Sequence, residues 1–190
     1  MMERAGAVAV VAEGCESGGH IGESTTMALV PQVCDAVKIP VIAAGGIADG
    51  RGMAAALMLG ACGVQMGTRF LVANECNVHE NYKKRVLKAK DIDTIVTGRR
   101  QGDAVRSLKN HFSRTFAKEE MDLNVSVEEL NRLGTGSLRH AAVDGDEQNG
   151  CFLAGQIAGL VKKEEPAADI VHSVCEEAEA LLKGAAKWVK

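Results

Sequence analysis

The sequence predicts an α/β protein built on a parallel sheet, and residues 41–70 carry most of that prediction. The apolar run Val41–Ala44 has the unbroken hydrophobicity typical of a strand buried on both faces. Residues 50–59 are rich in Ala, Leu and Met and suit a helix packed on that sheet, which Gly60 ends. A second short strand, Val64–Met66, follows. Strand, helix and strand in this order indicate parallel pairing.

Both strands end in glycine. Gly45 and Gly46 follow the first strand, and Gly67 and Thr68 follow the second. Glycine lets a chain turn sharply and brings bare N–H groups against a ligand. Two neighbouring turns of this kind hold phosphate in (β/α)₈ barrels. A single Gly-Gly is most often only a tight turn, but two in register favour a phosphate site.

The rest of the chain divides into a strand-bearing start and a helical second half. A strand over Val8–Ala12 leads into a polar, glycine-rich loop at residues 13–26. Pro31 is expected in the first turn of a helix that ends near Val37. Further helices are expected at residues 79–88, 104–116, 126–133, 151–161 and 166–189.

Size and charge narrow the possibilities. A closed (β/α)₈ barrel needs ~250 residues and rarely fewer than ~200. This chain has 190 residues and a long helical tail, so it leaves no room for eight strands. Its net charge of -3 comes from interspersed acids and bases, which indicates neither a nucleic-acid nor a membrane partner.

The six cysteines form no CxxC and no paired spacing, so we expect free thiols in a reducing, cytoplasmic compartment. The apolar run at residues 5–12 is too short to cross a membrane. The histidines in the helical half are interpreted as structural. None has the spacing of a metal site, and no metal is expected.

His20 is the main candidate for chemistry, because it lies among glycines at the end of a strand, where barrel enzymes place their active sites. It would donate a proton or a hydrogen bond to a substrate oxygen. A lone loop histidine is otherwise structural or exposed. Arg69 fits either phosphate binding or a salt bridge, and Asp49 fits an N-cap. Ser17 lacks a base and acid pattern around it, so a serine hydrolase is not expected.

Four ordered motifs resemble the nitronate monooxygenase family. They are EGCESGGHIG at residues 13–22, LVPQV at 29–33, PVIAAGGIADG at 40–50 and VQMGTRF at 64–70. The match continues through residues 108–110, 134–136 and 154–161. Within the family, the motifs look most like the FMN-dependent enoyl-acyl carrier protein reductase II branch.

The resemblance implies the C-terminal part of an FMN-binding TIM (β/α)₈ barrel, containing its last three strands, plus a small helical cap domain. Barrel residues would be 1–73, the helical cap or substrate domain 74–160, and a C-terminal helix 161–190. It assigns the FMN phosphate to Gly45, Gly46, Gly67 and Thr68. It places Ser17, Gly18, Gly19 and Gly22 along the flavin, and it makes His20 the active-site histidine. Residues 153–156 would face the substrate.

Several positions depart from the family pattern. Ser17 stands where the family often has Ala, and Asp103 where the reductase branch often has His. Cys151-Phe152-Leu153 replaces an expected Ser-Val-Met. Nothing corresponds to the first five barrel strands, so the chain is interpreted as a C-terminal portion.

The family implies NADPH- or NADH-dependent reduction of enoyl thioesters in fatty-acid synthesis. The substrate would be a small molecule or an acyl group on acyl carrier protein, and a homodimer is allowed. One alternative is oxidation of alkyl nitronates with O₂. Another is a truncated, inactive fragment. An inosinate dehydrogenase relative would need a catalytic cysteine loop, and no such loop is recognisable here.

Overall fold

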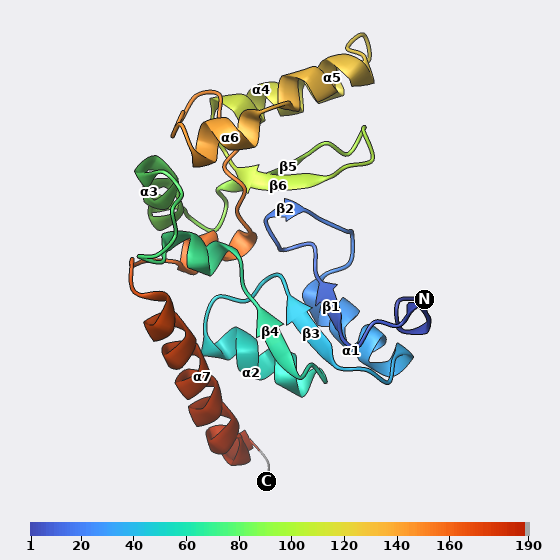
Figure 1. The fold of residues 1–190 in the computed structure, drawn as a ribbon, viewed down its shortest axis with the longest axis vertical. Coiled ribbons are helices and arrows are strands. Elements are labelled where there is room, and N and C mark those ends of the chain that lie inside the picture. Colours follow the sequence, from blue (N-terminus) through green and yellow to red (C-terminus); the bar gives the residue numbers. More distant parts are fainter. Residues whose placement is uncertain (189–190) are drawn as a thin grey trace.

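The computed structural model describes residues 1–188, which form two lobes (Figure 1). The lower lobe holds a parallel sheet in the order β1-β3-β4. Its elements are β1 (Val10–Glu13), α1 (Thr26–Ala36), β3 (Val41–Ala44), α2 (Gly50–Met58) and β4 (Gly63–Gln65). Val11 pairs with Ile42, and Ala43 pairs with Val64, so the carboxyl ends of all three strands meet at one edge.

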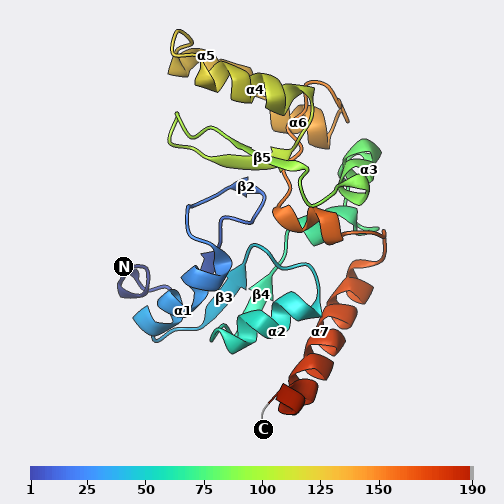
Figure 2. The same ribbon diagram turned by 180° about the vertical axis from the view of Figure 1, so that it is seen from behind.

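The upper lobe holds an antiparallel sheet in the order β2-β6-β5, covered by helices (Figure 2). Its strands are β2 (Gly19–His20), β5 (Thr94–Thr97) and β6 (Val105–Leu108). Its helices are α3 (Glu80–Lys88), α4 (His111–Met121), α5 (Val127–Gly134) and α6 (Ser137–Ala142). Because β2 belongs to the loop after β1, this sheet combines both halves of the sequence.

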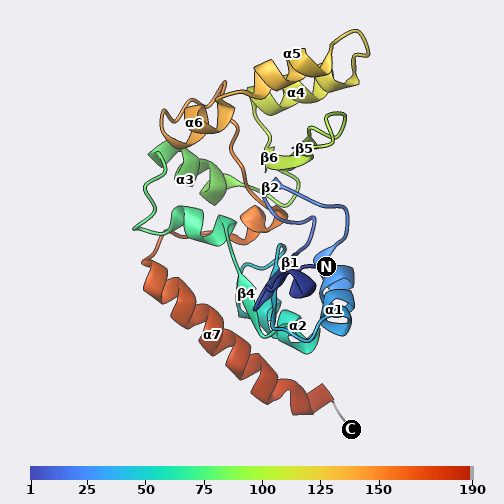
Figure 3. The same cartoon turned by 45° about the vertical axis from the view of Figure 1, so that its right-hand side comes forward.

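Helix α7 (Ala167–Lys183) returns the chain to the lower lobe and packs along α2 (Figure 3). A Cβ atom on Gly50 would lie 2.5 Å from the backbone N of Ala178, so only glycine permits this approach. The Glu177 carboxylate accepts the Gly50 N–H at 2.7 Å. Short 3₁₀ turns complete the chain at η1 (Glu3–Ala5), η2 (Thr68–Val72), η3 (Gln156–Leu160) and η4 (Gly184–Trp188).

Each lobe has its own apolar core. The lower core is built from small and β-branched residues, with Val30, Val41 and Ala43 almost fully buried. The upper core is larger in side-chain volume and centres on Tyr82 and Phe152, whose rings meet edge to face at 5.0 Å. Small residues suit a tightly spaced parallel sheet, whereas the hairpin needs aromatic rings to fill the space beneath its helices.

Several predicted elements are confirmed. Strand β3 covers Val41–Ala44 as predicted, and α2 begins at Gly50. The Asp49 side chain accepts the N–H groups of Arg51 and Gly52, which confirms its capping role. Helix α5 begins after Ser126, with the predicted capping box to Glu129.

The helix expected at residues 104–116 is wrong. The first part is strand β6, and helix α4 begins only after Asn110, whose side chain accepts the Ser113 N–H at 2.9 Å. Val105, Leu108, Phe112 and Phe116 happen to recur at helical spacing. Burial of the intervening Arg106 and Ser107 shows that residues 105–108 are covered on both sides, as in a central strand.

The helix expected at residues 151–161 is also wrong. The Leu108 N–H donates to the Phe152 carbonyl at 2.8 Å, so this segment lies extended beside β6 before turning into η3. Pro31 lies inside α1 rather than in its first turn, because the helix already begins at Thr26. The last predicted helix ends as α7 at Lys183 and continues as η4, and its predicted end at Val189 lies outside the described residues.

Within residues 1–188 the parallel sheet has three strands and does not close into a barrel. The predicted boundaries at residues 73 and 160 stay predictions. No helix in the described part of the chain is both long and apolar enough to span a bilayer.

Candidate functional site

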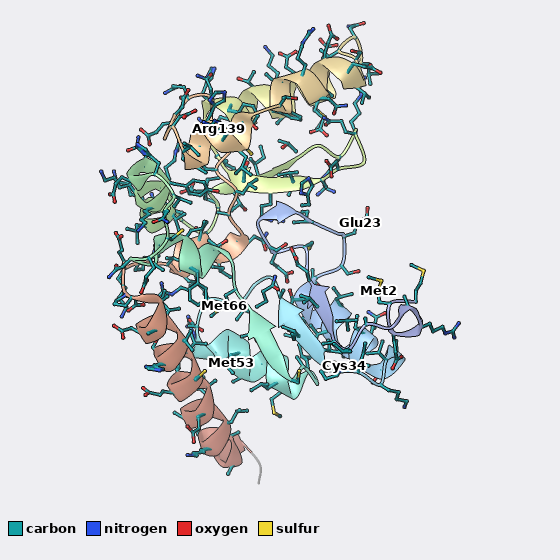
Figure 4. The ribbon with its side chains drawn as sticks, in the orientation of Figure 1. Met2, Glu23, Cys34, Met53, Met66 and Arg139 are labelled. Carbon is teal, nitrogen blue, oxygen red and sulfur yellow. The ribbon has the colours of Figure 1, made fainter. Side chains whose placement is uncertain are left out.

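A cleft of about 370 Å³ opens at the carboxyl edge of the parallel sheet, between the two lobes. Met66, at the lower side of the cleft, and Arg139, on helix α6 above it, are labelled in Figure 4. Six of the nine predicted site residues line it: Ser17, Gly18, Gly45, Gly46, Gly67 and Thr68. The two glycine turns therefore converge on one space, as their positions in the sequence predicted.

The turn after β3 requires glycine at both positions. Gly45 has φ +85° and Gly46 has φ +69°, a left-handed conformation that other residues rarely adopt. The N–H of Gly46 donates to no acceptor within the described residues. Helix α2 starts a few residues later with its N-terminus near the same edge. The turn thus presents an unpaired backbone donor to the cleft.

Thr68 provides the second polar group of this floor. Its Oγ1 accepts the N–H of Gly155 at 2.8 Å, which leaves the hydroxyl proton available to a ligand. Neighbouring Arg69 points away from the cleft and forms an ion pair with Glu165, each residue 8% exposed. Between the two roles considered for Arg69, the structure shows the salt bridge. Burial lowers the pKa of this guanidinium.

The loop between β1 and α1, residues 14–25, forms one wall and is called the site loop below. Its Glu16 carboxylate accepts both the backbone N–H of Thr26, at 3.0 and 3.1 Å, and the Thr26 hydroxyl, at 2.8 Å. The N-cap residue Thr25 makes no side-chain cap of its own. Glu16 therefore provides a hydrogen-bond acceptor for the free N–H at the start of α1 and closes the base of the site loop.

Contacts from the upper lobe hold the same loop. The Arg106 guanidinium donates to the Cys15 carbonyl at 2.9 and 3.2 Å, and the N–H of Gln156 donates to the Glu16 carbonyl at 2.9 Å. Arg106 was missed in the sequence, because residues 104–116 were interpreted as a helix with an exposed polar face. A buried arginine at a strand position leaves no local signal.

His20 lies outside the cleft lining. Its side chain is 72% exposed, and its Nε2 lies 3.2 Å from an Asp103 carboxylate oxygen. Gly19 and Gly22 also lie outside the lining, although Gly19 has φ +84° and allows the bend into β2. The catalytic role of His20 and the flavin contacts of these glycines stay predictions.

The upper wall of the cleft is apolar. It is formed by Val78, Tyr82, Leu138, Ala142, Leu153 and Ile157. The Tyr82 hydroxyl donates to the Leu153 carbonyl at 2.7 Å, and burial raises the pKa of this phenol. The ionisable groups of the lining are otherwise Glu13 and Glu16, with no basic side chain among its described residues. An anion here would be held by N–H and hydroxyl donors.

The ionisable residues described do not assemble into a metal site, since nowhere do three His, Cys, Asp or Glu side chains gather in ligating positions. All six cysteines are free thiols, as the sequence predicted.

Comparison with known proteins gives one family. The nitronate monooxygenase model matches residues 1–177. A probable nitronate monooxygenase from Staphylococcus aureus is 38% identical over 95% of this chain and 53% of its own length. The chain therefore spans about half the length of the curated relatives it matches.

Two solved structures extend this likeness to three dimensions. FabK from Thermotoga maritima superposes with a TM-score of 0.95 at 47% identity, over 100% of this chain and 60% of FabK. A nitroalkane oxidase from Streptomyces ansochromogenes gives 0.81 at 32% identity, over 96% and 55% of the two chains. From the cleft, the motifs and these matches, we conclude that the chain belongs to the nitronate monooxygenase family.

Proposed function

We propose that this chain carries the phosphate-binding edge of an FMN-dependent oxidoreductase that reduces enoyl thioesters with NADPH or NADH. The observation that carries the proposal is the convergence of the two glycine turns on one cleft. The unpaired N–H of Gly46 follows strand β3, and the hydroxyl of Thr68 follows the neighbouring strand β4. The structural likeness to FabK, an enoyl-acyl carrier protein reductase II, supports the proposed reaction.

The cleft residues fit a flavin mononucleotide. Gly46, Gly67 and Thr68 would hold its phosphate through backbone N–H groups and a hydroxyl. Glu16 also lines the cleft, but its charge is directed into the N-terminus of α1 by three hydrogen bonds from Thr26. The apolar wall around Leu153 and Ile157 offers the dry surface that a ring system and an acyl chain need.

When bound, the flavin supplies the hydride chemistry. The protein's part is to bind, orient and exclude water. The apolar upper wall excludes water from the reacting carbons, and Tyr82 is fixed as part of that wall through its bond to Leu153. We assign His20 to orienting the thioester carbonyl or supplying the proton, with Asp103 holding its ring when no substrate is present.

Flavin retention tests the proposal directly. The purified chain is mixed with FMN and desalted, and its visible spectrum is recorded. Retention near one flavin per chain would support the cleft as the cofactor site, and Gly46→Ala should abolish it. A chain that folds by circular dichroism but retains no flavin would contradict the proposal for this chain.

Nitronate oxidation is the second candidate, favoured by the name of the Staphylococcus aureus relatives. The same cleft would bind an alkyl nitronate, with His20 near the nitro group. NADPH oxidation that depends on crotonyl thioester separates the reductase from nitronate-dependent O₂ uptake without NADPH. If the chain is an inactive fragment, neither activity should be detected and no flavin should be retained.

A further inference from the structure

A second hollow, of about 220 Å³, lies in the upper lobe and shares no lining residue with the cleft. It is lined by the end of α3, the residue before β5, the end of β6, the start of α4 and the loop after α6. Its ionisable side chains are four basic residues, Arg85, Lys88, Lys109 and Arg114, against two acidic ones, Asp93 and Glu147. The hollow thus carries a positive excess that the cleft lacks.

Arg85 lines this hollow, and its side chain is held in place. Its guanidinium carbon stacks 4.9 Å from the ring centroid of Phe152, a fully buried residue. Its Nε is buried and has no hydrogen-bond partner. The nearest acid, Glu147, comes only within 3.6 Å of that nitrogen and is itself 54% exposed. The Arg85 side chain is 23% exposed, and its terminal nitrogens donate to no described residue, so a fixed guanidinium with unused terminal donors is prearranged for a planar or tetrahedral oxyanion.

The other basic groups leave charge available around Arg85. Lys109 is positioned by its bond to the Ile92 carbonyl, at 2.5 Å, and an ammonium group has two further donors. The side chains of Lys88 and Arg114 make no hydrogen bond or ion pair with the described residues. The Asp93 carboxylate is already hydrogen-bonded within the turn at residues 90–93, where it accepts the Lys90 N–H at 2.9 Å.

We propose that this hollow is a binding site for a phosphate-bearing small molecule, distinct from the cofactor cleft. The terminal nitrogens of Arg85 bind the phosphate oxygens, while Lys88, Lys109 and Arg114 neutralise the phosphate charge. The volume and the four cations suit one or two phosphate groups. Glu147 competes with the ligand for Arg85, so an occupied site displaces that weak ion pair.

Titration calorimetry with the full chain tests the site, using inorganic phosphate, pyrophosphate and ADP in separate runs. Chloride at matched ionic strength controls for screening. Saturable binding of all three ligands that persists with excess FMN present to occupy the cleft identifies a site for phosphate itself. Binding of ADP alone identifies a nucleotide as the source. No saturable heat from any of them would overturn the proposal.

Variants separate a built site from diffuse charge. The double variant Lys88→Gln/Arg114→Gln should weaken pyrophosphate binding roughly tenfold, because charged hydrogen bonds and close charges are both lost. The matched control is Lys84→Gln/Lys118→Gln, which removes two charges from exposed positions on the same helices outside the hollow. An equal loss in the control would contradict a specific site.

A further variant, Glu147→Gln, should change the affinity for pyrophosphate in the opposite direction. Glu147→Gln removes the competing carboxylate from Arg85 and should tighten pyrophosphate binding several-fold. A merely structural role of the pair predicts weaker or unchanged binding. Glu147→Gln therefore tests the role of Arg85 without replacing Arg85 itself, whose removal would also cost the contact with Phe152.

Discussion

Single glycines decide how closely the backbone segments around the cleft approach. A Cβ atom on Gly18 would lie 2.5 Å from the carbonyl carbon of Ala154, and one on Gly155 would lie 2.7 Å from the Glu16 carbonyl oxygen. The family resemblance assigned Gly18 to the flavin. Its packing against residues 154–155 could not be read from the sequence, because it depends on contact between positions far apart in the chain.

Replacing Gly18 with alanine should therefore displace the site loop. We expect a loss of about 1–3 kcal/mol in unfolding free energy, the usual cost of forcing atoms into a packed space, together with weaker flavin retention. Gly22→Ala is the matched control in the same loop, since a Cβ atom there meets nothing within 4 Å. Urea titration of both variants checks the prediction, and equal effects would refute it.

Tyr82 offers a pH-dependent prediction at the same scale. Burial raises the pKa of its phenol above the ordinary value of 10.0, so the folded chain keeps the proton at pH values where the unfolded chain releases it. Stability should therefore be fully present below pH ~10 and fall as the pH rises beyond it.

The chain has one tyrosine, so absorbance at the tyrosinate band reports this group alone. The band should appear together with unfolding rather than before it. Tyr82→Phe should remove the part of the alkaline stability loss that this phenol contributes. Titration of the phenol at pH ~10 in a folded chain would contradict its burial.

At the scale of elements, local pattern succeeded where an element is decided by its own residues. The strand at Val41–Ala44 and the capped helix α2 are of this kind. It failed for β6 and for the segment around Phe152, which are extended because each pairs with the other through the Leu108 N–H. Apolar spacing alone cannot distinguish a buried strand from a helix when the partner lies far along the chain.

The turn from β4 into η2 is anchored by an ion pair to the start of α7. Arg69 and Glu165 are both 8% exposed, and Lys163 also reaches Glu165. Removing Glu165 leaves the buried Arg69 charge without compensation, whereas Glu165 keeps Lys163 when Arg69 is removed. Arg69 sits directly after Thr68, so the pair also supports the cleft floor.

We expect Glu165→Gln to lower the unfolding free energy by about 3 kcal/mol or somewhat more, and Arg69→Met to lower it by less, because Glu165 keeps its ion pair with Lys163. The double variant Arg69→Met/Glu165→Gln should lose clearly less than the sum, because no uncompensated arginine remains. Denaturant unfolding of the four proteins gives the coupling energy. Strict additivity would mean that the pair does not act as a unit.

At the scale of the whole molecule, the cleft exists because two lobes meet over the site loop. The sequence predicted the residues of its floor, since the ends of parallel strands share one edge. It did not predict the upper contacts of the loop, which come from β6 and from Gln156. Such contacts depend on the tertiary arrangement, which places residue 106 beside residue 15.

Arg106 makes two of these interlobe hydrogen bonds, and its replacement gives the last prediction. It is 8% exposed and donates to the Cys15 carbonyl and to Thr94. Arg106→Gln should leave that carbonyl without its charged donor, which costs on the order of 1.5–3 kcal/mol in the local opening free energy. Amide exchange in the site loop and β2 should then accelerate roughly tenfold or more, while exchange in α2 and α7 stays unchanged.

Arg100→Gln is the matched control for this experiment, because Arg100 lies in the turn between β5 and β6 and also donates to a carbonyl, that of Asp122, but at an exposed position. It should leave exchange in the site loop at the native rate. If Arg106→Gln instead accelerates exchange in both lobes equally, the molecule opens as one unit. If neither variant changes exchange, the site loop is held by its lower anchor, Glu16 on Thr26, without help from the upper lobe.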